Sequence, residues 1–70
     1  MRYPVIVEPT STGYSAYSPD VSGCAAAGDT VEQTRLNFQD ALASHFEARR
    51  EVGEPIPKPT SSIAFVEIIC

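Results

Sequence analysis

The sequence predicts an α+β domain in which one long helix covers one face of a four-stranded mixed sheet, in the order β-β-β-α-β. Residues 30–51 are a long stretch without Pro or Gly, and their apolar residues recur at helical spacing. Three short segments before this stretch and one after it have the composition of strands bounded by turn residues. A helix with one apolar face needs a sheet to pack on, so the two kinds of segment belong to one core.

The helix is predicted to start after Thr30 and to stop before Gly53. Thr30 and Gln33 have the spacing of a capping box, in which each side chain bonds the other residue's backbone amide. Gly53 is suited to the left-handed conformation that ends a helix, and Pro55 prevents the helix from resuming. The residues that share the expected core face are Val31, Phe38, Ala41, Leu42 and Phe46.

The strands are expected at residues 3–8, 14–18, 24–27 and 62–69. The first two form a hairpin around the turn-forming residues 9–13. The last segment, SIAFVEII, is rich in β-branched residues. A right-handed crossover through the helix would make the fourth strand parallel to the third, and the most compatible strand order is 3-2-1-4.

Residues 53–59 join the helix to the last strand and carry proline at alternate positions. Such a segment is stiffened toward the polyproline II conformation. We expect it to be a rigid strap that carries the chain back across the sheet. The alternative is that Pro55, Pro57 and Pro59 form a proline-rich ligand for another protein.

Length and composition indicate a single domain over residues 1–70 with a small core. The net charge of −4 disfavours direct binding of nucleic acid, which needs a basic patch. It suits a basic protein partner, or it simply maintains solubility. Two cysteines and no secretory signal predict a reduced, cytoplasmic setting, and no apolar run is long enough to span a membrane.

Several short motifs follow one another in order along the chain. They are Tyr3-Pro-Val, Gly13-Tyr-Ser-Ala-Tyr-Ser-Pro-Asp20, Gly23-Cys24, Gly28-Asp29-Thr30, Asn37, Ala41-Leu42, His45 and Gly53-Glu-Pro-Ile-Pro57. As an ordered set over nearly the whole chain, they resemble the N-terminal domain of the HicB antitoxin family.

The resemblance implies a partial ribonuclease H-like fold, a HicA-type toxin as partner, and a homodimer or higher homo-oligomer. A HicA toxin is a small basic RNA-cleaving protein, which a HicB protein binds and blocks. Many HicB proteins carry a C-terminal DNA-binding domain, which we do not expect here because the chain ends in its fourth strand. The family usually has apolar residues near Thr34 and Arg35, so the first helical turn is expected to be less buried here.

We expect binding and not catalysis, with no catalytic residue, metal site or cofactor. Ribonuclease H chemistry needs clustered carboxylates, one of them on the first strand, to hold divalent metal ions. The middle of that strand is apolar, and Glu8 comes only at its end. His45 beside the core face is read as a structural histidine, the alternative being an acid–base residue.

Tyr14, Tyr17, Asp20 and Asp29 are the predicted partner-binding residues. The two tyrosines point to opposite faces of their strand, so one is expected in the core and the other offers an interface anchor. The two aspartates either close turns through side-chain hydrogen bonds or contact a basic partner.

Ile6, Ile63, Phe65 and Ile69 are the predicted oligomer interface. Alternation places them together on the sheet face that the helix leaves open, and the last strand is also a sheet edge. Both features favour a second copy in a two-fold dimer. In the alternative, the strap folds over this patch. The competing function is a stand-alone oligomeric regulatory or structural module without a toxin partner.

Overall fold

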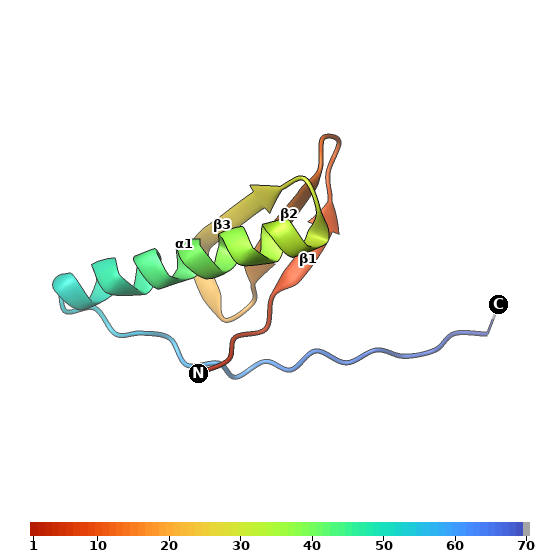
Figure 1. The fold of residues 1–70 in the computed structure, drawn as a ribbon. Helices are drawn as coiled ribbons and strands as arrows, with labels where there is room; N and C mark the ends of the chain where they lie inside the picture. The colour runs from red at the N-terminus through yellow and green to blue at the C-terminus, as the bar shows by residue number, and fades with distance from the viewer. Residues whose placement is uncertain (70) are drawn as a thin grey trace.

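The computed structural model describes residues 1–69, which form an antiparallel sheet covered on one face by a long helix (Figure 1). The strands are β1 (Ile6–Pro9), β2 (Tyr14–Ser18) and β3 (Val21–Gly28), and the helix is α1 (Val31–Glu51). The strands are arranged in the order β1-β2-β3. This confirms the predicted α+β class and the three-strand meander.

Both ends of α1 lie where the sequence predicts. The Thr30 hydroxyl accepts a hydrogen bond from the Gln33 amide at 3.0 Å. The described chain does not form the reciprocal half of the capping box, and the Gln33 side-chain amide donates to the Asn37 side chain, one turn further along. Gly53 has a φ of 76°, and the amides of Gly53 and Glu54 bond the carbonyls of Arg50 and Arg49. This is the Schellman arrangement that ends a helix.

The first hairpin pairs β1 with β2, with Ile6 opposite Tyr17 and Pro9 opposite Tyr14. The second strand has the predicted bounds, whereas β1 starts three residues later than predicted and ends at Pro9. The chain before Ile6 turns instead toward the strap, where the Tyr3 hydroxyl donates a hydrogen bond to the Pro57 carbonyl at 2.7 Å.

β3 is longer than the predicted residues 24–27, because the turn before it is shorter than expected. Ser18 pairs with Val21, but Tyr17 pairs with Ala25, so the ladder is irregular at this point. Gly23 lies in the extra length of β3 with a φ of 80°, a conformation that glycine adopts without steric cost. This glycine belongs to a bulge inside the strand and not to the turn.

The core lies between α1 and the sheet. Its buried apolar residues are Ala16, Val21, Cys24, Phe38 and Phe46. The placement of Val31 on the core face is wrong, and the expectation of a less buried first helical turn holds at Val31 but fails at Thr34. Val31 is 52% exposed, and Thr34 is completely buried, with its hydroxyl donating to the Thr30 carbonyl.

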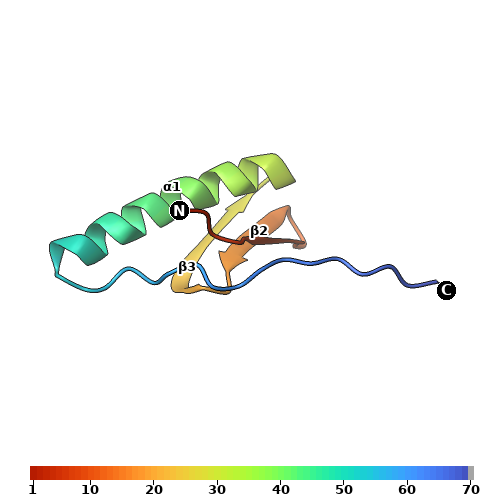
Figure 2. The same ribbon diagram turned by 90° about the horizontal axis from the view of Figure 1, so that it is seen from below.

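The predicted fourth strand is not formed. Residues 52–69 contain no strand, so the sheet has three strands and the order 3-2-1-4 does not occur in the described chain. The strap runs back below α1 to the near end of the sheet, and the chain beyond it extends away from the body of the domain (Figures 1 and 2). We call residues 62–69 the arm. Its apolar side chains are exposed, with Phe65 at 94%.

No described helix has the length and apolarity that a membrane span requires. The longest dimension of the structure, 50 Å, runs through the helix and the arm.

Candidate partner-binding surface

The sheet has one face that no helix of the described chain covers, and we call it the open face. Residues directly opposite each other in an antiparallel sheet project to the same side. Ala16 and Val7 are partners, and both pack in the core under α1. Their neighbours along the strands therefore point the other way. The open-face residues are Ile6, Glu8, Ser15, Tyr17, Ala25 and Ala27.

Tyr17 stands at the centre of the open face. It lies between Ile6 of β1 and Ala25 of β3, and its side chain is 42% exposed. Alanine on the neighbouring strand leaves the tyrosine ring standing above its surroundings. A large amphipathic ring with two side-chain torsions loses little entropy when a partner covers it, which is why tyrosine is common at interface centres.

The four predicted partner-binding residues do not form one cluster. Tyr14 pairs with Gly28, the residue before Asp29, at the end of the sheet where the β1–β2 turn lies. Tyr17 and Asp20 lie toward the opposite end, and the two tyrosines project from opposite faces as predicted. Ala25 and Ala27, which lie beside Tyr17, were not predicted as part of this surface. The signal that could have found them is the run of small residues in this strand, which leaves a flat surface next to the tyrosine.

Asp20 holds the root of the arm. Its carboxylate accepts hydrogen bonds from the amide and hydroxyl of both Thr60 and Ser61, at 2.7 to 3.2 Å. These bonds stabilise the charged form, so the pKa of Asp20 lies below its usual value, chiefly through the Ser61 hydroxyl. The prediction that an aspartate here closes a turn missed this contact, because Thr60 and Ser61 are forty residues away in the chain and no local motif marks them.

The predicted oligomer residues are also separated. Ile6 lies on the open face in β1, whereas Ile63, Phe65 and Ile69 lie in the arm outside the sheet. The single apolar patch expected from a fourth strand is therefore absent from the described chain. Its members are exposed at a different place, with Ile69 fully accessible to solvent.

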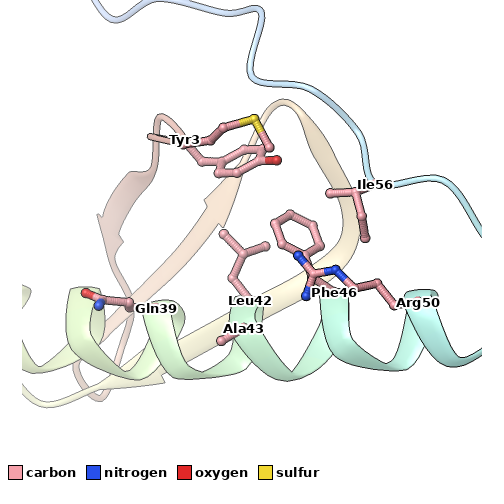
Figure 3. Close-up of a pocket in the computed structure, with 8 residues that line it drawn as sticks. Tyr3, Gln39, Leu42, Ala43, Phe46, Arg50 and Ile56 are labelled. Carbon is pink, nitrogen blue, oxygen red and sulfur yellow. The ribbon is translucent and has the colours of Figure 1, made fainter.

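A shallow apolar groove lies on the helix side of the molecule, between the N-terminal segment and α1 (Figure 3). Tyr3, Leu42, Phe46 and Ile56 line it, and the ring centroids of Tyr3 and Phe46 are 5.1 Å apart. Arg50 borders the groove. This mixture of lining residues provides apolar contact area and does not bring together an acid, a base and a nucleophile.

The His45 ring accepts a hydrogen bond at Nε2 from Arg49 Nε at 3.1 Å and packs beside Phe46. This is the environment of the structural histidine that the sequence predicts. Within residues 1–69, no three His, Cys, Asp or Glu side chains lie close enough together to hold a metal ion. Burial raises the pKa of the free Cys24 thiol, which keeps it protonated and unreactive.

Two known proteins are similar in sequence to most of this chain. The chain is 41% identical over 69 residues to antitoxin HicB 2 of Photorhabdus laumondii, a match that covers 97% of this chain and 50% of that protein. It is also 41% identical over 58 residues to an uncharacterized 14.9 kDa protein of Haemophilus phage HP1, covering 83% of this chain and 44% of the phage protein. The chain thus spans about half the length of these relatives.

Solved structures show the same fold. A chain in a HicA3 and HicB3 toxin–antitoxin complex matches with a TM-score of 0.75 at 37% identity, covering 86% of this chain and 70% of that one. A crystal structure of antitoxin HicB3 matches with a TM-score of 0.71, also at 37% identity, over 86% of this chain and 44% of that one. The family model that matches residues 3–67 describes a HicB-like antitoxin of a bacterial toxin–antitoxin system. The chain therefore belongs to the HicB-like antitoxin family.

Proposed function

We propose that this chain binds a small RNA-cleaving toxin of the HicA type and blocks it by occlusion, without catalysis. The observation that carries the proposal is the likeness to a chain of the HicA3 and HicB3 complex, at 37% identity over 86% of this chain. The net charge of −4 supports it, because an acidic surface attracts a basic RNA-binding protein. Occlusion then follows from competition between the antitoxin and the RNA for one surface of the toxin.

The open face around Tyr17 is the surface that would contact the toxin. It combines a half-exposed aromatic ring, small neighbours that leave the ring accessible, and the Glu8 carboxylate in the adjacent strand. An aromatic anchor on a flat surface with a charged rim is the usual anatomy of a binding hot spot. Tyr14 and Asp29 would add contacts only at the end of the sheet with the β1–β2 turn, and Asp20 is already bonded to Thr60 and Ser61 at the root of the arm.

Three further features belong to the proposal. The chain acts in the reduced cytoplasm, it makes no direct contact with nucleic acid, and it functions as a homodimer or higher homo-oligomer. The acidic balance and the free Cys24 thiol support the first two. The exposed apolar side chains of the arm support the third.

An RNA-cleavage assay tests the function. The neighbouring open reading frames are searched for a short basic protein with one prominent histidine, and that protein is purified and mixed with RNA. Addition of this chain is expected to suppress cleavage in proportion to the fraction of toxin bound. Failure to suppress a confirmed toxin would contradict the antitoxin function. Cleavage by this chain alone, with Mg²⁺ or Mn²⁺ present, would contradict the non-catalytic part.

The second candidate is an oligomeric regulatory or structural module without a toxin partner. The exposed arm favours it, because an apolar extension promotes self-association whether or not a toxin exists. Oligomers that form normally, together with no binding to any basic protein encoded nearby, would support this module over the antitoxin.

A further inference from the structure

The outer edge of β1 has unpaired backbone groups centred on Val7. The Thr10 amide bonds the Gly13 carbonyl across the hairpin at 2.8 Å. Hydrogen-bonded and non-bonded pairs alternate along an antiparallel ladder, so the pair of Glu8 and Ser15 is bonded and the pair of Val7 and Ala16 is not. The amide and carbonyl of Val7 therefore point away from β2, where the described chain offers them no partner.

The opposite edge of the sheet is in a different state. On β3, the Ala27 carbonyl accepts a hydrogen bond from the Asn37 side-chain amide at 2.8 Å. α1 itself packs mainly on β3 and least on β1. On the β1 side of the described chain, backbone groups are therefore unpaired and apolar side chains are incompletely covered. Val5, Val7 and Leu42 remain half-buried there, although they pack against the core.

The arm is chemically suited to this edge. It alternates two rows, a wholly apolar one with Ala64, Val66 and Ile68 and a mixed one with Ile63, Phe65, Glu67 and Ile69. An apolar row on one side and a row that contains a carboxylate on the other suit a sheet position with one face under a helix and one face open, because a lone carboxylate is costly to bury. At about 3.3 Å per residue, the arm is long enough to pair along the whole of β1.

The attachment of the arm directs it away from its own β1. Pro55, Pro57 and Pro59 stiffen the strap, and the next two residues are fixed to Asp20 by their amides and hydroxyls. Beyond this root the arm diverges from the sheet in both views (Figures 1 and 2). A stiff connection with a fixed root opposes the bend that pairing within one chain requires, and such connections favour exchange of the element between copies.

We propose that two copies of this chain exchange arms, each arm adding as a parallel fourth strand to the β1 edge of the other copy. This inference deepens the homo-oligomer part of the proposed function and rests on it. The exchange satisfies the outward backbone groups of Val7, buries the row with Ala64, Val66 and Ile68 under α1 and completes the β1 side of each core. In the exchanged dimer each sheet would have the strand order 3-2-1-4. The sequence predicts this order, but the described chain does not form it by itself.

Light scattering of the intact chain and two variants tests the role of the arm. The native protein is expected to be a dimer at micromolar concentration, and Val66→Glu is expected to be a monomer, because it places a carboxylate in the row that exchange buries. Lys58→Gln is the matched control, because it changes the net charge by the same amount in the exposed strap. It is expected to remain a dimer. A monomeric native protein, or a Val66→Glu variant that dimerises equally well, would overturn the proposal.

Isotope-filtered NMR separates exchange from folding back. Labelled and unlabelled chains are mixed after unfolding, and nuclear Overhauser contacts are sought between the Val7 amide and the arm. Exchange predicts that these contacts join a labelled chain to an unlabelled one. Contacts confined to single chains would overturn exchange even in a dimer.

These outcomes are independent of the toxin assay. A monomer that still suppresses toxin cleavage would overturn only the exchange of arms. A dimer with exchanged arms that fails to suppress cleavage would overturn only the antitoxin function.

Discussion

Gly28 of β3 and Thr34 of α1 are in such close contact that position 28 has no room for a side chain. A Cβ atom on Gly28 would lie 2.7 Å from Thr34 Oγ1 and 2.9 Å from the Thr34 amide nitrogen. The hydroxyl cannot turn aside freely, because it donates a 2.6 Å hydrogen bond to the Thr30 carbonyl. This contact sets how closely the first turn of the helix approaches the sheet.

Gly28→Ala is therefore expected to destabilise the domain by about 1–3 kcal/mol, the usual cost of overpacking. Urea unfolding followed by circular dichroism measures the change. Gly23→Asn is the control, since nothing lies within 4 Å of its Cβ position and asparagine tolerates a positive φ. A Gly28→Ala variant as stable as the native protein would show that the contact with Thr34 does not limit the approach of the helix.

Phe38→Ala is expected to cost about 3–5 kcal/mol, because it empties a buried site in a small core. Phe38 is 3% exposed, whereas Leu36 on the same helix is 42% exposed. Leu36→Ala should accordingly change stability by no more than about 0.5 kcal/mol. Thermal melts of both variants compare them directly, and a similar shift for the two would mean that the two faces of α1 are assigned wrongly.

Local signals predicted the helix and the hairpin well. Thr30, Gly53 and the apolar spacing between them act within a few residues, so they can be read from the sequence. The open face was also predictable in part, because alternation places Ile6 and Tyr17 on it once the strands are aligned.

The rest depends on contacts that sequence patterns do not encode. The residues 62–69 have strand composition, but composition does not say which chain supplies the neighbouring strand. The bonds from Thr60 and Ser61 to Asp20 join distant parts of the chain. Thr34 was misjudged because a threonine can be buried once its hydroxyl bonds the preceding helical turn.

The attachment of the arm at Asp20 is expected to fail in acid. The folded pKa of Asp20 lies below its unfolded value, so its contribution is fully present above the unfolded pKa of about 3.9. The contribution is lost as the pH falls through the lower folded pKa. The amide signals of Thr60 and Ser61 should therefore shift together in an NMR titration below about pH 4.

Asp20→Asn should abolish this titration, while Asp29→Asn should leave it unchanged. The asparagine keeps one carbonyl acceptor but carries no ionisable group. A transition that persists in Asp20→Asn would assign the effect to another carboxyl group.

Tyr3→Phe is expected to loosen the strap at a cost of about 0.5–1.5 kcal/mol, the net value of one hydrogen bond. It removes the 2.7 Å bond to the Pro57 carbonyl and keeps the ring that packs against Phe46. Urea unfolding gives the energy, and lower NMR backbone order parameters at Ile56 and Lys58 would report the loosening. Tyr14→Phe is the control, because the Tyr14 hydroxyl makes no hydrogen bond to residues 1–69. An equal loss of stability in both variants would show that the lost hydrogen bond to the Pro57 carbonyl is not the cause.

Tyr17→Ala is expected to weaken toxin binding about thirtyfold, which corresponds to roughly 2 kcal/mol at a binding hot spot. Leu36→Ala is the matched control, because Leu36 and Tyr17 are each 42% exposed but lie on the helix and on the open face. Isothermal titration calorimetry with the purified toxin measures both variants, after circular dichroism has shown that each is folded. A toxin that binds Tyr17→Ala as tightly as the native chain would remove the open face from the proposed interface. Reduced binding by Leu36→Ala alone would place that interface on the outer side of α1, and the antitoxin function would stand in either case.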